Sequence, residues 1–444
     1  MRATIPVARE GLPIPVLLYL ICVIVPFGFS LGPLVLSSVR LFLLLMAAPL
    51  LLRILQGHLG RIYASDVFFF LHMVWFSLAM IVVSPQQAIE QIGSVGVEFL
   101  GGYLLGRVYI RTYDHYLALA RFLVVVCIAM LPFAIYETLT GDPILLMLLQ
   151  SVPGMKTVEV ITYETRLGFE RVQLMFAHPI HFGLFCSLVL MQAVVASAPG
   201  TTFARGRGFF SSVLITLSGA LSLSSGPLFS FALQFGFLAW DWILRSVRSR
   251  WFWLLGLFAL SYVAIDLFSS RTPIRVFMSY ATFSAETAYW RSMIFDYGMD
   301  NVWAHPVLGL GMGDWARPWY MFTSSVDNFW LLLAMRSGIP ALIFLAVGYF
   351  WMLLRIMRLK IPASSPLAGV RRAWVFSFTA LAFTLTTVHV WSNLYSFVFF
   401  LFGAGLWLIH ASLDDEQTAP APSTIRSGPV YSRFEARKRQ RDTD

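Results

Sequence analysis

Apolar runs of about 20 residues recur along this chain from Pro13 to His410, each long enough to cross a hydrocarbon layer of roughly 30 Å. Short polar stretches separate the runs, which favours membrane-spanning helices. We expect twelve spans, with boundaries good to a few residues. They are 13–30, 32–52, 66–84, 92–110, 116–136, 178–197, 208–223, 227–244, 251–269, 328–354, 373–390 and 392–411. The pattern predicts an all-α polytopic membrane protein.

Composition agrees with this prediction. The chain is 58% hydrophobic and 12% charged, and its mean hydropathy of +0.73 exceeds what a soluble core needs. Cys22, Cys127 and Cys186 all fall inside apolar runs without metal-ligand spacing, so we interpret them as small core residues. The cysteines therefore indicate neither a disulfide nor a metal site, and we predict no cofactor.

The distribution of basic residues predicts the orientation. Of the 32 lysines and arginines, 23 lie on the side of the two chain ends, eight lie on the other side, and Arg40 lies inside the second span. Cytoplasmic loops are the ones enriched in bases, so we expect both termini in the cytoplasm. The net charge of +9 lies in short loops rather than on one face, which argues against a nucleic-acid partner. The eight external bases are Lys156, Arg166, Arg171, Arg271, Arg275, Arg291, Arg317 and Arg336.

We expect residues 1–411 to form one transmembrane domain and residues 412–444 a disordered cytoplasmic tail, since the tail cannot bury a core. Two external loops, 137–177 and 270–327, are much longer than the other connections. Long loops in compact proteins are disproportionately functional. The second loop is rich in Trp and Tyr and is typical of a helical cap on the membrane face.

The first loop leads into the sixth span through a basic and histidine-containing segment. Arg166 and Arg171 precede His178 and His181, and Pro179 stands in the first turn of the span. Guanidinium groups suit phosphate oxygens. The two histidines could face one another as metal ligands do, but a polar cap at the membrane surface is the simpler interpretation.

The second loop carries Arg291 and the sequence "GLGMG" from Gly309. This sequence does not follow a strand and lacks the full glycine spacing of a dinucleotide site, so we expect a tight turn that brings backbone close to other groups. Asp327 and Asn328 close the loop at the start of a span. Both are ordinary helix N-caps, so capping and catalysis are both open for them.

Polar residues within the spans are few. Arg336 lies in a span that Gly338 and Pro340 interrupt, and an unpaired charge there should face a cavity or a partner. Arg40 and Glu98 are the other two that we expect to line an internal cavity, although a structural ion pair is equally plausible. No chain of acidic residues crosses the spans, which weakens a proton-coupled transporter.

Three segments together resemble the bacterial O-antigen ligase and polymerase superfamily. "RVQLMFAHPIHFG" is similar to its segment with an Arg eight residues before a Pro. "YWRSMIFDYGMDNVWAHPVLGLGMG" is similar to its Arg, aromatic-rich helix and Pro-x-x-Gly-x-Gly. In the ligases a His-Asn pair is followed by nine residues and a Gly; here the pair is Asp327 and Asn328, and the Gly is Gly338.

The resemblance implies a GT-C-like glycosyltransferase that uses undecaprenyl-pyrophosphate-linked sugar on the periplasmic face, without a metal. It implies that arginines hold the pyrophosphate, and by position these are Arg171 and Arg291, with Arg166 and Arg336 as further candidates. Asp327, Asn328 and Arg291 are the candidate catalytic residues. His178, His181 and Arg40 are other candidate site residues.

Departures from the ligase pattern indicate which member of the superfamily the chain resembles. Asp327 replaces the ligases' His, Ile180 stands where Asn is frequent, and "LSLSSGPLFSF" lacks an Arg that often follows its Ser. "SSGP" is more similar to exopolysaccharide polymerases. These features favour a polymerase of lipid-linked repeat units over a lipid A ligase.

We therefore predict a polysaccharide polymerase of the bacterial inner membrane. Its expected partners are the undecaprenyl-pyrophosphate-linked glycan, membrane lipid, a chain-length regulator and a flippase. Alternatives are a glycan ligase of the same superfamily, a polytopic transporter or flippase that works through Arg40 and Glu98, and an envelope scaffold without activity.

Overall fold

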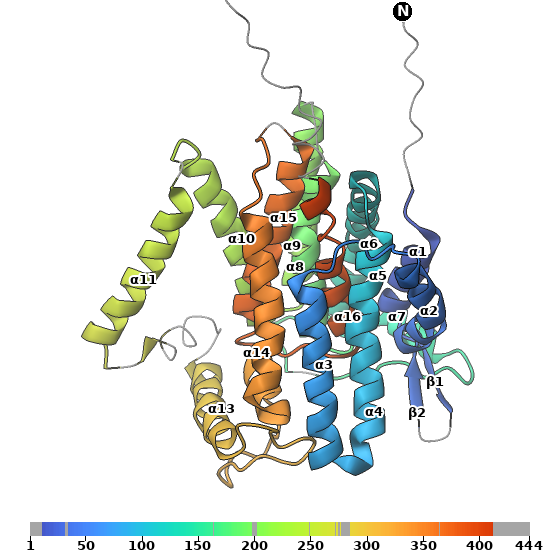
Figure 1. Ribbon diagram of the computed structural model, residues 1–444, viewed down its shortest axis with the longest axis vertical. Helices are drawn as coiled ribbons and strands as arrows, with labels where there is room; N and C mark the ends of the chain where they lie inside the picture. The colour runs from blue at the N-terminus through green and yellow to red at the C-terminus, as the bar shows by residue number, and fades with distance from the viewer. Residues whose placement is uncertain are drawn as a thin grey trace, which may run out of the picture.

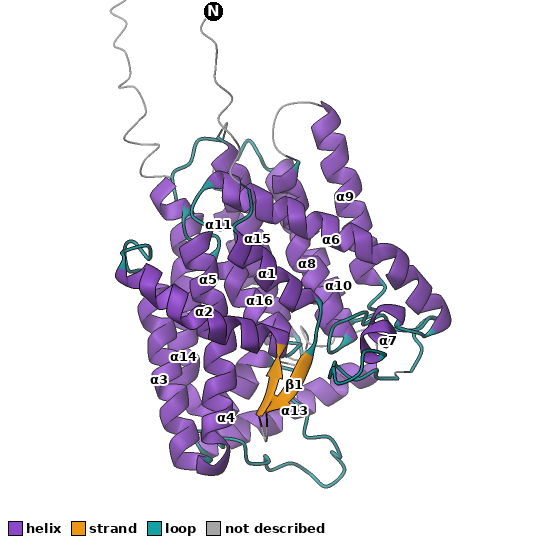
Figure 2. Cartoon of the chain, turned by 90° about the vertical axis from the view of Figure 1, so that its right-hand side faces the viewer, coloured by secondary structure: helices purple, strands orange, loops and turns teal. Residues whose placement is uncertain are grey.

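The computed structural model describes residues 11–411 apart from 32–33, 163, 198–201, 248, 271, 274–275, 277–284 and 364. The expected tail 412–444 lies outside the described residues, as do Arg271 and Arg275. Within the described part of the chain, helices form a bundle with one small two-stranded sheet at its side (Figure 1, Figure 2).

The helices follow one another along the chain with short connections, except around the two long loops. They are α1 (Ile14–Ile24), α2 (Ser38–Leu55), α3 (Ala64–Val83), α4 (Pro85–Gly96), the π-helix η1 (Val97–Gly101), α5 (Gly102–Tyr109), α6 (Tyr113–Thr140), α7 (Ile144–Gln150), α8 (Pro179–Ala196), α9 (Thr202–Ala220), α10 (Ser225–Ile243), α11 (Arg250–Phe268), α13 (Ala285–Ala304), α14 (Phe329–Met357), α15 (Pro366–Thr384) and α16 (Ser392–Gly403).

Seven helical segments in the described residues are long and apolar enough to cross a membrane. They are α2, α3, α6, α8, α11, α14 and the stretch Ser392–Ala411 that begins with α16. The prediction of an all-α, multi-pass membrane protein is thus confirmed. Each of the twelve expected spans overlaps a helix, and that all twelve cross the membrane stays a prediction.

The first two expected spans differ from the structure. Helix α1 has only 11 residues, about 16 Å at 1.5 Å per residue. Val25 is extended because Pro26 follows it, and the helix ends there. The strands β1 (Gly28–Leu31) and β2 (Leu34–Ser37) then form an antiparallel hairpin in which Gly28 pairs with Ser37. The predicted span 13–30 and the start of span 32–52 were wrong to that extent.

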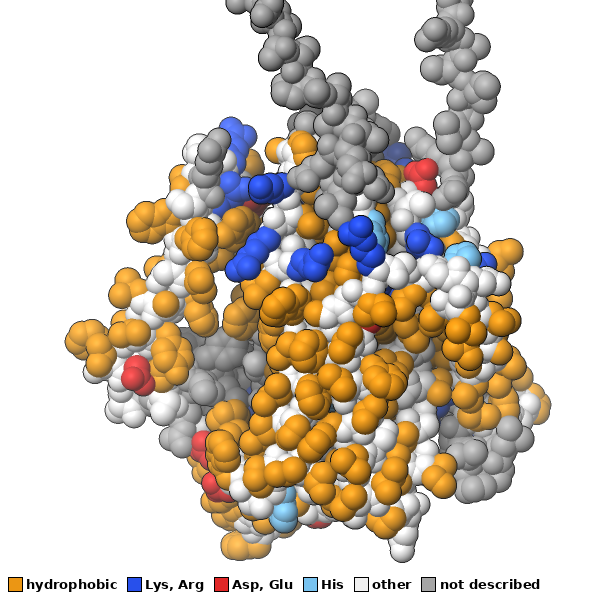
Figure 3. Space-filling model, in the orientation of Figure 1, with side chains coloured by type: hydrophobic (Ala, Val, Ile, Leu, Met, Phe, Trp, Pro, Cys, Tyr) orange, Lys and Arg blue, Asp and Glu red, His pale blue; other side chains and the backbone are white. Residues whose placement is uncertain are grey.

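The bundle has a buried centre and an apolar outer surface. Most residues of α8 and α16 are buried, whereas α11 has no buried residue and leans away from the other helices (Figure 1). The side chain of Phe70 on α3 is 60% exposed, and on the face shown in Figure 3 apolar side chains cover α3 and α14. An outer surface of this kind is suited to lipid.

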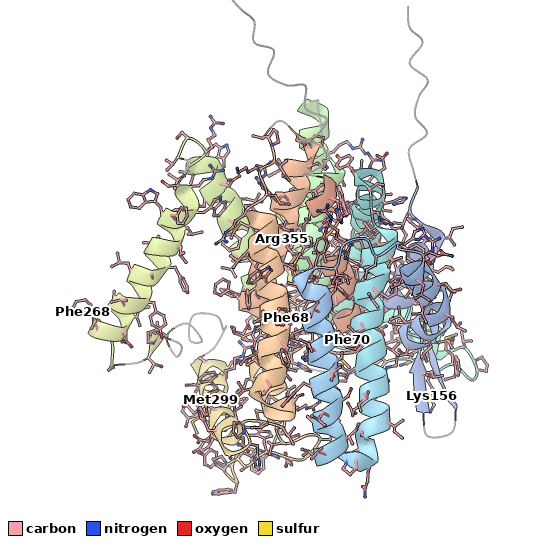
Figure 4. All side chains as sticks on the ribbon, in the orientation of Figure 1. Phe68, Phe70, Lys156, Phe268, Met299 and Arg355 are labelled. Carbon is pink, nitrogen blue, oxygen red and sulfur yellow. The ribbon has the colours of Figure 1, made fainter. Side chains whose placement is uncertain are left out.

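Basic side chains gather at one end of the bundle. Figure 3 shows a band of Lys and Arg above the apolar surface, at the end where the chain enters α1, and Arg355 at the end of α14 belongs to it (Figure 4). Met299 on α13 lies at the opposite end. The two ends of the bundle therefore differ in charge.

Helices α5 and α16 approach closely through glycine. A Cβ on Gly106 would lie 2.1 Å from the carbonyl oxygen of Phe400, and one on Gly403 would lie 2.3 Å from that of Tyr103. Small residues at helix crossings let backbones meet in this way. The contact fixes α16, whose start carries part of the candidate site.

Helix α14 is broken at Gly338, which has φ +80° and ψ 169°. Pro340 has no N–H, so the break releases carbonyl groups of the preceding turn. The turn beginning at Gly309 satisfies them: the Leu310 N–H donates to the Met335 oxygen at 2.7 Å and the Gly311 N–H to the Arg336 oxygen at 2.9 Å. The expected tight turn with close backbone contacts is confirmed.

Gly338→Ala should destabilise the fold. Its Cβ would lie 2.0 Å from the Val307 oxygen, on a backbone that L side chains rarely adopt. We expect the free energy of unfolding to fall by at least about 2 kcal/mol, measured by thermal unfolding in detergent. Gly256→Ala in α11 is the matched control, because open space surrounds it. Equal stability of the two variants would contradict this account of the break.

Candidate functional site

Five segments converge in the half of the bundle away from the basic band. They are the first long loop, the α9–α10 turn, α13, the start of α14 and the α15–α16 loop. Charge interactions join them: Arg291 with Asp327 and Arg166, His178 with Arg171 and Arg166, and His389 with Arg336. The structure thus brings together the predicted arginines, which lie up to 170 residues apart in the sequence (Arg166 to Arg336).

The α9–α10 turn holds the two arginines of the first loop. Arg166 donates from Nη1 to the carbonyl oxygen of Leu223 at 2.8 Å, and Arg171 donates from Nη2 to Oγ of Ser224 at 2.9 Å. Oγ of Ser224 in turn donates to the Ser222 oxygen at 2.9 Å. Leu223 has φ +45°, a strained value for leucine. Leu223 and Ser224 therefore orient the two guanidinium groups, and of these only Ser224 belongs to "SSGP".

Arg291 is buried on α13 and only 8% exposed. Its Nε and Nη1 atoms are inaccessible and have no hydrogen-bond partner among the described residues. Burial lowers the pKa of Arg291, the Asp327 carboxylate opposes this shift, and the charge of Arg166 adds to it. A guanidinium with unused buried donors is suited to an anion.

A second buried arginine shows what a structural role looks like in this chain. Arg107 is 4% exposed, but its Nε lies 3.6 Å from Oδ1 of Asp66 and its Nη2 donates to the Arg61 oxygen at 2.7 Å. Its guanidinium also lies over the Tyr63 ring. Arg291 makes no ion pair of this kind with any residue that the structure describes. The contrast favours a ligand for Arg291.

Helix α13 holds Arg291 against the first half of α14. Ile294 and Val302 on α13 pack with Leu331 and Met335 on α14 in a small core of their own. The side chain of Asn301 fastens the following loop, donating to the Ala316 oxygen at 2.8 Å and accepting from the Ala316 N–H at 2.9 Å. Arg291 is therefore fixed relative to the start of α14.

Asp327 and Asn328, at the start of α14, have different contacts. Asn328 is the N-cap, and its Oδ1 accepts from the Leu331 N–H at 3.0 Å. Asp327 is half-buried, accepts from Oγ of Ser325 at 3.2 Å, and is close enough to Arg291 to affect its pKa. The helix cap is therefore Asn328, and the carboxylate of Asp327 acts electrostatically on Arg291.

Arg336 lies at the end of the first half of α14, just before the break at Gly338. It is half-buried and makes no ion pair with a described residue. Its charge acts on His389, which is in the α15–α16 loop. The structure thus places Arg336 at the edge of the same cluster, on the side of the histidines.

Three histidines surround the ring of Trp391. The ring centroids of His181, His389 and His178 lie 3.9, 5.5 and 5.9 Å from that of Trp391. His178 caps α8, where its Nδ1 accepts from the Ile180 N–H at 3.0 Å. Pro179 occupies the first turn as expected.

His178 and His389 are both neutral near pH 7. Burial, followed by the charges of Arg171 and Arg166, lowers the pKa of His178 to about 4. Burial and the charge of Arg336 lower the pKa of His389 to about 4. These rings can therefore accept hydrogen bonds at neutral pH. Within the described residues, no three His, Cys, Asp or Glu side chains are grouped as a metal site would need.

Arg40 lies on the wall of a neighbouring cavity of about 190 Å³, which His181 also lines. Its Nε donates to Oε1 of Glu98 at 2.7 Å. Glu98 is on η1, so this ion pair joins η1 to α2. Arg40 therefore forms an ion pair and also lines a cavity, which were the two alternatives expected for it.

His389 and Trp391 were not among the predicted site residues, and Ser224 was noted only as part of "SSGP". The expected span 373–390 ran through His389, but α15 ends at Thr384 and residues 385–391 form a loop. The polar stretch "TTVHVWSN" was the available signal, because it interrupts an otherwise apolar region. Ser224 could have been found only by knowing that Arg171 lies beside it.

Comparison of the sequence with protein-family models and with curated proteins finds no match.

Replacing each residue of the pair should separate their roles. Asn328→Ala removes the cap, worth about 1 kcal/mol, so hydrogen exchange of the Leu331 amide should accelerate about fivefold. Asp327→Ala should leave that amide unchanged, since Asp327 does not bond to it. Mass-spectrometric hydrogen exchange in detergent measures both. Faster exchange in Asp327→Ala alone would contradict the assignment of the cap.

Proposed function

We propose that this chain is a polysaccharide polymerase of the bacterial inner membrane. It joins oligosaccharide repeat units that are linked to undecaprenyl pyrophosphate, on the periplasmic face. The observation that carries the proposal is Arg291, a buried guanidinium with two unpartnered nitrogen atoms beside Arg166. A pyrophosphate supplies the negative charge and the acceptor oxygens that this site lacks.

The reaction needs charge stabilisation on the leaving group. A hydroxyl oxygen of the acceptor sugar attacks the anomeric carbon of the donor, and the bond from that carbon to the phosphate oxygen breaks. The electron pair goes to the pyrophosphate, where Arg291, Arg171 and Arg166 stabilise the charge. The hydroxyl proton goes to a carboxylate, for which Asp327 is the candidate. Arginines supply this stabilisation without a metal.

The surroundings of the cluster support a lipid-linked substrate. The outer surface of α3 and α14 is apolar, and the Lys and Arg band lies at the other end of the bundle (Figure 3). By the excess of bases on cytoplasmic loops, that end and both termini face the cytoplasm, and the cluster faces the periplasm. A flippase would deliver the donor there, and a chain-length regulator would act on the product.

A glycan ligase of the same superfamily uses the same leaving group, so the arginine cluster suits it equally. Asp327 in place of the ligases' His favours the polymerase. A transporter or flippase acting through Arg40 and Glu98 is less favoured, because these two side chains bind each other at 2.7 Å. A direct ion pair between two side chains inside a bundle is typical of a structural contact.

Purified protein with a lipid-linked repeat unit, without metal or nucleotide, should form a ladder of longer glycans. Arg291→Ala should lower the rate by about 10²- to 10³-fold, the usual cost of removing a charge-stabilising donor. Arg291→Lys should retain part of the rate, because it keeps the charge but loses the fork geometry. Gel analysis of the products measures the ladder.

Arg245→Ala is the matched control, since Arg245 is exposed and lies just after α10, whose end lies at the other end of the bundle (Figure 1). It should form the ladder at the wild-type rate. A normal ladder from folded Arg291→Ala would refute the arginine assignment, and a ladder that requires added magnesium would refute the metal-independent mechanism.

Envelope analysis of a deletion strain separates the polymerase from the ligase. Loss of a polymerase should leave single repeat units on the lipid carrier, because no step joins them. Loss of a ligase should instead leave long polymer on the carrier. Mass spectrometry of extracted lipid-linked glycans distinguishes the two, and long carrier-bound polymer would favour the ligase.

A further inference from the structure

A buried carboxylate at the end of α6 holds the part of the first long loop that carries Arg171. The side chain of Glu137 is 3% exposed. Its Oε1 accepts from the Gln173 N–H at 2.7 Å, and its Oε2 accepts from the Leu174 N–H at 3.0 Å. Two successive N–H groups that converge in this way form a concavity suited to an anion. The loop is therefore fastened to α6 through the carboxylate of Glu137.

The end of α6 does not require this side chain. Gly141 follows the helix with φ +83°, and its N–H donates to the backbone oxygen of Glu137 at 2.8 Å. This bond completes the helix end with backbone groups alone. A buried carboxylate is costly unless hydrogen bonds compensate it. At Glu137 the compensating bonds come from the loop, so the carboxylate serves the loop and not its own helix.

The same carboxylate stabilises a strained residue. Leu174 has φ +49°, a value that is uncommon for residues other than glycine. Strained conformations persist only where the surrounding contacts enforce them, and they gather at functional sites. The bonds from the Gln173 and Leu174 N–H groups to Glu137 are contacts of this kind. Loss of the carboxylate should therefore release the backbone close to Arg171.

The residues on both sides of Arg171 are also attached by their backbone. Before it, Oγ1 of Thr138 donates to the Glu170 oxygen at 2.8 Å, and the Glu170 N–H donates to the Thr138 oxygen at 3.2 Å. After it, the Val172 N–H donates to the oxygen of Leu221, just after α9, at 3.2 Å. The backbone of Arg171 is thus fixed between α6 and the α9–α10 turn, to which its guanidinium also donates.

The earlier part of the first long loop has an attachment of its own. The Gly28 N–H of the β1–β2 hairpin donates to the Lys156 oxygen at 2.7 Å, and the Lys156 N–H donates to the Gly28 oxygen at 2.9 Å. Lys156 is labelled beside the hairpin in Figure 4. These bonds do not involve Glu137. Substitution of Glu137 should therefore move the segment around Arg171 and leave the earlier part of the loop in place.

We propose that Glu137 is a positioning residue, which sets the place of the Arg171 guanidinium through the backbone of residues 172–174. Glu137 acts through Arg171 and not by contact with the substrate. The guanidinium then meets the leaving group without rearrangement during the reaction, which is what makes a charged donor effective. The effect of Glu137 on glycan transfer rests on the proposed function, whereas its effect on the position of Arg171 does not.

The position of Arg171 can be measured directly in the full-length protein in detergent. Glu137→Ala should accelerate hydrogen exchange of the Leu174 amide at least about tenfold, because hydrogen bonds to charged groups are strong. It should also increase the rate at which phenylglyoxal, a reagent for guanidinium groups, labels Arg171, measured by mass spectrometry. Exchange of the Leu331 amide on α14 should not change, which checks that the rest of the fold is intact.

Glu164→Gln is the matched control, because Glu164 is an exposed carboxylate in the same loop. It should leave the exchange and the labelling unchanged. Glu137→Gln should have a smaller effect than Glu137→Ala, because its amide oxygen still accepts from the Gln173 N–H while its NH2 group replaces an acceptor. Unchanged exchange of the Leu174 amide, or unchanged labelling of Arg171, in Glu137→Ala would overturn the proposal.

A double-mutant cycle on ladder formation tests whether Glu137 acts through Arg171. Alone, Glu137→Ala should lower kcat about 10- to 100-fold with less change in KM, because a displacement of about 1 Å can cost this much. In the Arg171→Ala background it should lower kcat less than about threefold. Equal factors in the two backgrounds would indicate an independent structural loss and would overturn the positioning role.

The two kinds of measurement separate this proposal from the proposed function. A wild-type protein that forms no ladder would refute the polymerase, and the exchange and labelling would still decide whether Glu137 positions Arg171. A normal ladder from folded Glu137→Ala, with faster exchange and labelling, would leave the polymerase standing and overturn the role of Glu137 in it.

Discussion

A broken helix in an apolar surrounding must have its backbone groups satisfied by other protein groups, because lipid offers none. In this protein the break at Gly338 meets that constraint through one contact, the turn at Gly309 to Gly311 that donates to the freed carbonyls. The turn belongs to the loop that follows α13. The requirement at the break thus fixes the loop and α13 on the first half of α14, and with them Arg291 beside Asp327.

The cluster formed in this way contains two arginines, Arg291 and Arg336, that form no ion pair with a described residue. Arg166 and Arg171 donate hydrogen bonds to groups of the α9–α10 turn, which orient the guanidinium groups. Elsewhere in the bundle, arginines are paired with carboxylates, as Arg107 is with Asp66. The proposed pyrophosphate would supply at the cluster the negative charge that Asp66 supplies to Arg107.

The sequence predicted the individual helices and charged residues of the site better than it predicted which of them lie close together. The length of an apolar run is a property of neighbouring residues, so it identifies helices from the sequence alone. Every expected span overlaps a helix. Arg171, Arg291 and the Gly-rich turn stood out as charges and glycines in long loops. His389 did not, because the polar stretch around it is short and hydropathy does not distinguish a short loop from the end of a helix. The role of Ser224 depends on Arg171, 53 residues away, and that is tertiary information.

The attachment of the first long loop to the hairpin has a further consequence. Lys156 joins Gly28 only by backbone N–H and C=O groups in that bridge, which every residue except proline possesses. The position can exchange its side chain while the loop keeps its path. Substitutions at this position other than proline therefore leave the path of the first long loop, and the two arginines that the loop carries, in place.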